Sequence, residues 1–208
     1  MTSATDDPIA VRRLNLPAAQ ALADLASIFN ELQTVLRCCE RLVSELDPRT
    51  GPGDDLVLEG VWTTALLSYS RCFTSEDSGM CLSESDVEST GLEGEVVEWH
   101  KALRRMRKHF ADPVHNPRER FEIGAAQDDD GRATGIAITS TPQPALDDTT
   151  VRQTGALAYS LSELVDKRIS EQQEKVFAAV EKLSTSELNR LACIEVSVPE
   201  QGTPPPEE

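Results

Sequence analysis

The residues best suited to chemistry gather between His100 and Arg120, in the stretch HKALRRMRKHFADPVHNPRER. This stretch holds seven of the twenty Lys and Arg residues and all three histidines of a chain whose net charge is −16. A histidine can give or take a proton near neutral pH, because its ordinary pKa is about 6.5, and an arginine can hold a phosphate through its planar fork. These residue types could serve RNA chemistry, phosphate binding or plain solvation. The candidate catalytic residues are Arg104, Arg107, His109 and His115.

The same segment also has ordinary structural interpretations. Its arginines and lysines can form the solvated face of an amphipathic helix and neutralise the acidic segment 76–98 that precedes them. His100 and His109 can be hydrogen-bonded residues of a packed helix. Four aromatic residues lie on apolar faces, which favours core packing over base stacking: Trp62, Tyr69, Phe73 and Trp99.

Other kinds of site have little support in the sequence. The chain contains no G-x-S-x-G, no glycine-rich nucleotide loop and no C-x-x-C. Its five cysteines are odd in number and lie mostly in apolar helical patterns, which favours reduced thiols. We therefore expect no cofactor and no metal. The net charge disfavours general affinity for nucleic acid, so any contact with RNA must be local or contributed by two copies.

Helical periodicity dominates the elements that must position these residues. Apolar residues recur every three or four positions from Ala18 to Leu46, which predicts one long helix. A second helix, over about Asp55–Ser75, is apolar nearly all round and is expected in the centre of a bundle. We interpret the acidic segment Glu76–Glu98 as a loop with a short helical turn. A third helix starts near Glu95 and stops at Asp112-Pro113.

The second half of the chain predicts a hairpin and a last long helix. The sequence DDDGR lies between two short β-prone runs, which predicts a β-hairpin at about residues 119–141. Helical periodicity then continues from about Asp148 to Leu191, and its polar second half is expected to project beyond the bundle or pair with a partner helix.

Together these elements predict an all-α fold, an antiparallel helical bundle with a small β-hairpin between the third helix and the last long helix. The expected organisation is a flexible N-terminus over 1–16, one bundle domain over 17–191, and a disordered acidic, Pro-rich tail over 192–208. Because no stretch reads as a signal peptide or a membrane span, we expect a cytoplasmic protein that does not bind membranes.

Two stretches resemble the HEPN superfamily of helical bundles, which includes many ribonucleases and many inactive relatives. One is VWTTALLSYSRCF, residues 61–73, and the other is HKALRRMRKHFADPVHN, residues 100–116; the likeness extends over about 18–116 and the last helix. The resemblance implies a symmetric dimer in which Arg and His side chains of two facing helices cleave RNA without a metal. Aligned on the family phrase, however, this chain has Asp112 where active members carry His and Met106 where they carry Arg. Arg104 with His109, or His115 beyond Pro113, could replace them only outside the usual register.

The leading hypothesis is therefore a HEPN-like helical protein without intact catalysis. It would act by association, as a homodimer or with a partner protein, in a prokaryotic or phage defence, toxin-antitoxin or mobile-element context. One alternative is a metal-independent endoribonuclease that uses the Arg and His residues of the third helix. Another is an acidic adaptor or nucleic-acid mimic that occupies a basic partner.

Overall fold

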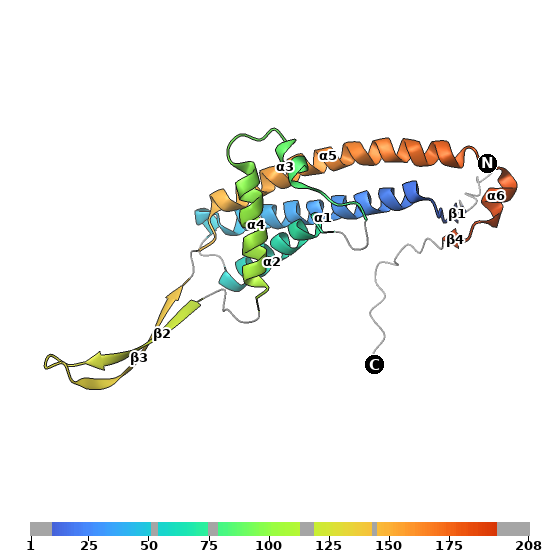
Figure 1. Ribbon diagram of the computed structural model, residues 1–208. Coiled ribbons are helices and arrows are strands. Elements are labelled where there is room, and N and C mark those ends of the chain that lie inside the picture. Colours follow the sequence, from blue (N-terminus) through green and yellow to red (C-terminus); the bar gives the residue numbers. More distant parts are fainter. Residues whose placement is uncertain (1–9, 51–53, 75–78, 113–118, 143–144, 195–208) are drawn as a thin grey trace, which may run out of the picture.

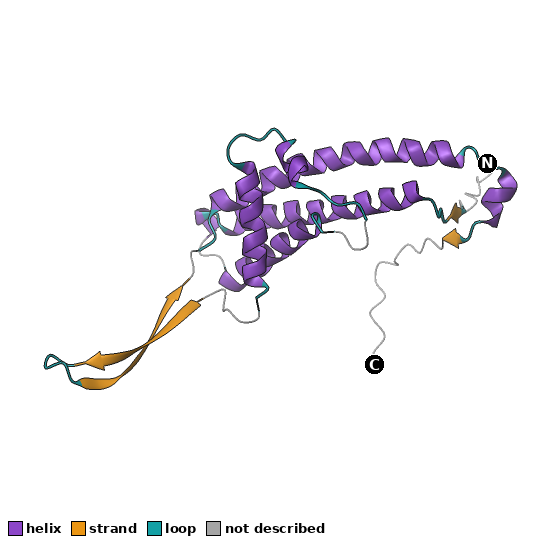
Figure 2. Cartoon of the chain, in the orientation of Figure 1, coloured by secondary structure: helices purple, strands orange, loops and turns teal. Residues whose placement is uncertain are grey.

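The computed structural model describes residues 10–50, 54–74, 79–112, 119–142 and 145–194, and it is mostly helical (Figures 1 and 2). In chain order, its elements are β1 (Val11–Arg12), α1 (Pro17–Glu45), a 3₁₀ turn (Pro48–Thr50), α2 (Asp55–Arg71), α3 (Glu84–Glu88), α4 (Val96–Phe110), β2 (Glu119–Gln127), β3 (Ala133–Pro142), α5 (Asp148–Val180), α6 (Thr185–Arg190) and β4 (Cys193–Ile194). The predicted helical fold with one small hairpin is confirmed at this level. None of the described helices is both long enough and apolar enough to cross a membrane.

Helices α1 and α5 run antiparallel along the length of the molecule, α2 packs against α1, and α4 packs against α2 (Figure 1). The predicted spacing of apolar residues on α1 is confirmed, because the buried positions recur every three or four residues: Leu25, Ile28, Leu32, Val35, Cys39 and Leu42. Helix α1 starts at Pro17, where a missing amide hydrogen costs no hydrogen bond.

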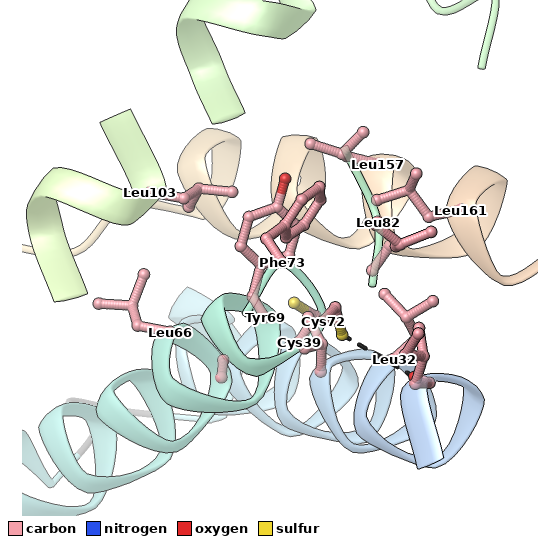
Figure 3. Close-up of a cluster of buried hydrophobic side chains, with 14 of the residues drawn as sticks. Leu32, Cys39, Leu66, Tyr69, Cys72, Phe73, Leu82, Leu103, Leu157 and Leu161 are labelled. Atoms are coloured by element: carbon pink, nitrogen blue, oxygen red, sulfur yellow. Dashed lines mark hydrogen bonds between the residues drawn. The ribbon is translucent and has the colours of Figure 1, made fainter. Parts of the chain in front are cut away.

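The core forms where α1, α2, α4 and α5 meet. Figure 3 shows Tyr69 of α2, and Phe73 just beyond the end of that helix, between Leu103 of α4 and Leu157 of α5. Tyr69, Leu103 and Leu157 are fully buried. The prediction that α2 is buried on nearly all sides needs correction, because Leu56 in its first turn is 71 % exposed. This turn is instead fixed by Asp54, whose carboxylate accepts hydrogen bonds from the backbone amides of Leu56 (2.9 Å) and Val57 (3.2 Å).

The described part of the segment between α2 and α4 is more firmly anchored than a plain loop. Its predicted short helical turn is α3, which begins with a capping box between Ser83 and Asp86. Asp86 also forms an ion pair with Arg168 of α5. Leu82 and Val87 beside it are buried in the core. The segment therefore covers the core between α2 and α5.

The last helical stretch is not the single helix that periodicity predicted. Helix α5 ends at Val180, and α6 starts anew after Ser184, whose backbone amide donates to Glu187 Oε2 at 2.8 Å. This capping box satisfies the open amide groups of a new helix start, so the chain turns here. The polar second half of α5 lies along the start of α1, with Gln172 Nε2 donating to the Ala18 carbonyl at 2.9 Å.

Two short strands lie inside the end segments that we expected to be unstructured. Strand β1 pairs antiparallel with β4, with Val11 opposite Ile194. Arg12 Nη1 also donates to the Leu191 carbonyl at 2.9 Å. Residues 1–9 and 195–208 lie outside the described residues, so the predictions for them stay open.

The predicted hairpin is confirmed as β2 and β3, which form a two-stranded antiparallel ribbon with Ile123 opposite Ile138. Gly131 has a φ of 78°, the left-handed conformation that the turn requires and that glycine adopts most easily. Asp128 stabilises the same turn by accepting from the backbone amides of Asp130 (3.1 Å) and Arg132 (2.8 Å). The ribbon projects away from the bundle, on the side where α4 ends and α5 begins (Figure 2).

Candidate functional site: a cationic groove between two helices

Helix α4 separates its apolar and basic residues around its axis. His100 and Leu103 are fully buried against the core, while Arg104, Arg105, Arg107 and Lys108 are exposed. Three of these, Arg104, Arg107 and Lys108, are spaced three and four residues apart and therefore lie on one face. Basic residues in the last turn also interact favourably with the negative end of the helix dipole.

The basic face of α4 borders a groove of about 550 Å³ against the C-terminal half of α2. We call it the cationic groove. On one side it is lined by Leu67, Ser70 and Arg71 of α2 and by Thr74 just after that helix, and on the other by Arg104, Arg105, Arg107 and Lys108 of α4. None of the described carboxylates lines it, although acidic residues outnumber basic ones by 36 to 20 in the whole chain.

The positive charge of the groove is mostly free of internal neutralisation. Arg71 forms an exposed ion pair with Glu31, with Nη1 and Oε1 3.3 Å apart. Within the part of the chain that the structure describes, no ion pair involves Arg104, Arg105, Arg107 or Lys108. Ser70 adds a buried hydroxyl that has no hydrogen-bond partner there. The described lining of the groove thus offers several cations to an anionic ligand.

The four residues predicted as catalytic do not form one constellation in the described structure. Arg104 and Arg107 line the groove, and their predicted catalytic role stays untested. His109 is exposed and is not among the residues that line it. His115 lies outside the described residues, so its predicted role stays untested.

His100 is a core residue and does not face the groove. It is fully buried, and its Nδ1 lies 2.8 Å from the Tyr69 hydroxyl, which we assign as the donor because a neutral Nδ1 accepts. The ring of Phe73 packs against it, with centroids 4.3 Å apart. Burial lowers the pKa of His100, and the nearby positive charge of Arg104 lowers it further. His100 is therefore neutral at pH 7 and has a structural role, one of the two interpretations that its sequence allowed.

The aromatic residues follow the structural interpretation as well. Trp62, Tyr69 and Phe73 are buried, and Trp99 packs against the same core. None of the four lines the cationic groove, so the groove has no aromatic surface on which bases could stack. Among the described residues, no group of three or more His, Cys, Asp or Glu side chains is placed to hold a metal ion.

What sequence reasoning missed is the α2 wall of the groove. Ser70, Arg71 and Thr74 lie in a stretch that reads as a core helix, and only tertiary packing brings them opposite Arg104. Their exposure could have been inferred from helical spacing, because Leu67, Ser70, Arg71 and Thr74 recur at three- and four-residue intervals.

Comparison with known proteins found no match to a protein-family model, to a curated protein or to a solved structure.

Proposed function

We propose that the chain is a HEPN-like helical protein that acts by association and has no ribonuclease activity of its own, and that its cationic groove binds the phosphate backbone of RNA. The resemblance to the HEPN superfamily supplies the context, a defence, toxin-antitoxin or mobile-element system. The cationic groove supplies the basic side chains that would bind the RNA phosphates.

One observation carries the proposal: an open groove whose charged lining residues, in the part of the chain that the structure describes, are all basic, although the chain has a net charge of −16. Like charges three and four residues apart on a helix destabilise it by a few tenths of a kcal/mol for each pair. Arg104, Arg107 and Lys108 carry this cost, and no carboxylate among the described lining residues offsets it. An RNA backbone would supply the missing negative charge, and arginine forks match the geometry of phosphate oxygens.

The chemistry of the groove explains why we propose binding and not cleavage. Metal-independent cleavage of RNA needs groups that transfer protons near neutral pH. Neither of the two described histidines, His100 and His109, lines the groove. Asp112 is aligned with the histidine of active HEPN proteins, so the aligned position has no imidazole to transfer a proton.

The proposal is tested by measuring RNA binding with matched charge changes. The double variant Arg104→Gln/Arg107→Gln removes two charges from the groove. The control variant Lys167→Gln/Lys175→Gln removes two charges from exposed positions on α5, so both proteins have the same net charge. Binding of a fluorescent single-stranded RNA is followed by anisotropy over a series of salt concentrations.

We expect the groove variant to bind more weakly and to lower the slope of log K against log salt by about 1.4, since two phosphate contacts are lost. The control should bind like the original protein. Equal weakening in both variants would show that only total charge matters and would contradict the proposal, as would no binding at all. Cleavage of the RNA that disappears in His109→Ala or His115→Ala would instead establish the endoribonuclease alternative.

A further inference from the structure

The β2–β3 ribbon has one apolar face and one polar face. The pairing register places Phe121, Ile123 and Ala125 of β2 on the same face as Ile136 and Ile138 of β3. The four large side chains of this set are 57 to 73 % exposed, with Phe121 lowest and Ile136 highest. The opposite face carries Arg120, Glu122, Thr139 and Thr141. We call the first set the apolar face of the ribbon.

Nothing in the described bundle covers this face. The ribbon projects from the molecule in Figure 1, and no helix packs extensively against either strand. A two-stranded hairpin without such support is marginally stable in water. We therefore expect this ribbon, whose strands have nine and ten residues, to be stabilised by a second surface packed against its apolar face.

We propose that the apolar face of the ribbon is a dimerisation surface, and that its occupant is the same face of a second copy of this chain. The face is complementary to itself in size. The two-fold axis would lie between the two faces, parallel to the line that joins Ile123 and Ile138. It would stack the faces tip to base, with the turn of one ribbon over the base of the other. Phe121 of each copy would then lie over the end of the other face where the small Ala125 leaves space.

Charge favours this antiparallel arrangement over a parallel one. The ribbon's turn carries three consecutive aspartates, Asp128, Asp129 and Asp130. Stacking two ribbons tip to tip would bring six carboxylates together, which costs free energy through like-charge repulsion. Stacked tip to base, the two turns lie at opposite ends of a ribbon roughly 30 Å long, well beyond the screening length of about 8 Å at physiological salt.

The area is sufficient for a reversible dimer. Three isoleucines and one phenylalanine exposed to this degree amount to roughly 500 Å² of apolar surface, within the range that commonly marks an interaction site. Two such faces bury about 1,000 Å² together, at the low end of specific interfaces. We therefore expect the dimer to form at micromolar concentrations and to dissociate on dilution.

The test uses the full chain and two substitutions of neighbouring residues on opposite faces. Ile138→Lys places a charge in the centre of the apolar face, and Thr139→Lys places the same charge on the polar face. Sedimentation velocity over about 1 to 200 µM gives the dissociation constant of each protein. We expect the original chain to form a dimer and Thr139→Lys to have a dissociation constant within about threefold of the original. Ile138→Lys should raise the dissociation constant by about 100-fold, because the charge is introduced in both copies.

Hydrogen exchange distinguishes loss of the dimer from loss of the fold. The amides of β2 and β3 should become better protected as concentration rises in the original chain and in Thr139→Lys, while α1 and α5 remain equally protected in all three proteins. A chain that stays monomeric throughout would overturn the proposal. So would a dimer that Ile138→Lys leaves intact, or one that both substitutions disrupt equally. Protection of the ribbon only in the presence of a different protein would assign the face to that protein and overturn it too.

Discussion

Replacing Tyr69 by Phe removes a single hydroxyl from the centre of the bundle. That hydroxyl lies 2.8 Å from His100 Nδ1, and both residues are fully buried. In Tyr69→Phe the ring nitrogen loses its partner in a site that water does not reach. Leaving a buried polar group unsatisfied costs about 1–3 kcal/mol. For a chain of this size, about 2 kcal/mol corresponds to a decrease in Tm of about 4 to 8 °C.

The assay is thermal and urea unfolding followed by circular dichroism. Tyr159→Phe is the matched control, because Tyr159 is 56 % exposed on α5 and the same substitution there should change stability by less than about 0.5 kcal/mol. The double variant Tyr69→Phe/His100→Leu should lose less than the sum of its single variants, since both partners of the bond are then removed. A Tyr69→Phe protein as stable as Tyr159→Phe, or strictly additive losses, would refute the buried hydrogen bond.

Three further outcomes are expected. Because burial lowers the pKa of His100, the unfolded chain takes up a proton there at a higher pH than the folded protein does. The free energy of unfolding should therefore fall as the pH drops below about 6.5. In a series of urea unfolding curves at different pH, His100→Leu should remove this dependence. Asp86→Asn should lower the free energy of unfolding in urea by about 1–2 kcal/mol, a modest loss because Arg168 is partly exposed. Burial raises the pKa of Asp86, but hydrogen bonds from Arg168 and Ser83 lower it overall. The stability that Asp86 contributes is therefore lost as the pH falls below its ordinary pKa of about 3.8. Leu32→Ala should cost about 2–5 kcal/mol by calorimetry, because Leu32 is fully buried between helices, and a smaller loss would show that α1 is loosely packed.

Local patterns were sufficient to predict those elements whose partners lie on one clear face. The spacing on α1 identified its buried stripe, and the Asp-Gly turn located the hairpin. The end of α5 was predicted wrongly because periodicity continues through Leu183, although Ser184 and Glu187 form a recognisable capping box. No local signal could have predicted β1 and β4, because each has only two residues and its partner lies at the other end of the chain.

The candidate site divides in the same way. The amphipathic pattern of the third helix predicted that Arg104 and Arg107 lie on its solvated face, and both are exposed in the structure; their catalytic role stays a prediction. The contribution of Ser70 and Arg71 required the packing of α2 against α4, which is a long-range contact. Likewise, the pairing of Asp86 with Arg168 joins residues 82 positions apart, and nothing in the acidic segment itself indicates that partner.

The packing of α1 against α5 also has a consequence for biosynthesis. A ribosome completes α1 at Glu45 but must add 135 more residues before α5 ends at Val180. At the usual rate of translation this interval is roughly 7 to 27 s. During that time only α2 can cover the apolar stripe of α1. The nascent chain therefore exposes an apolar helix face. Chaperone capture and slow, late collapse are therefore the expected route to the native state.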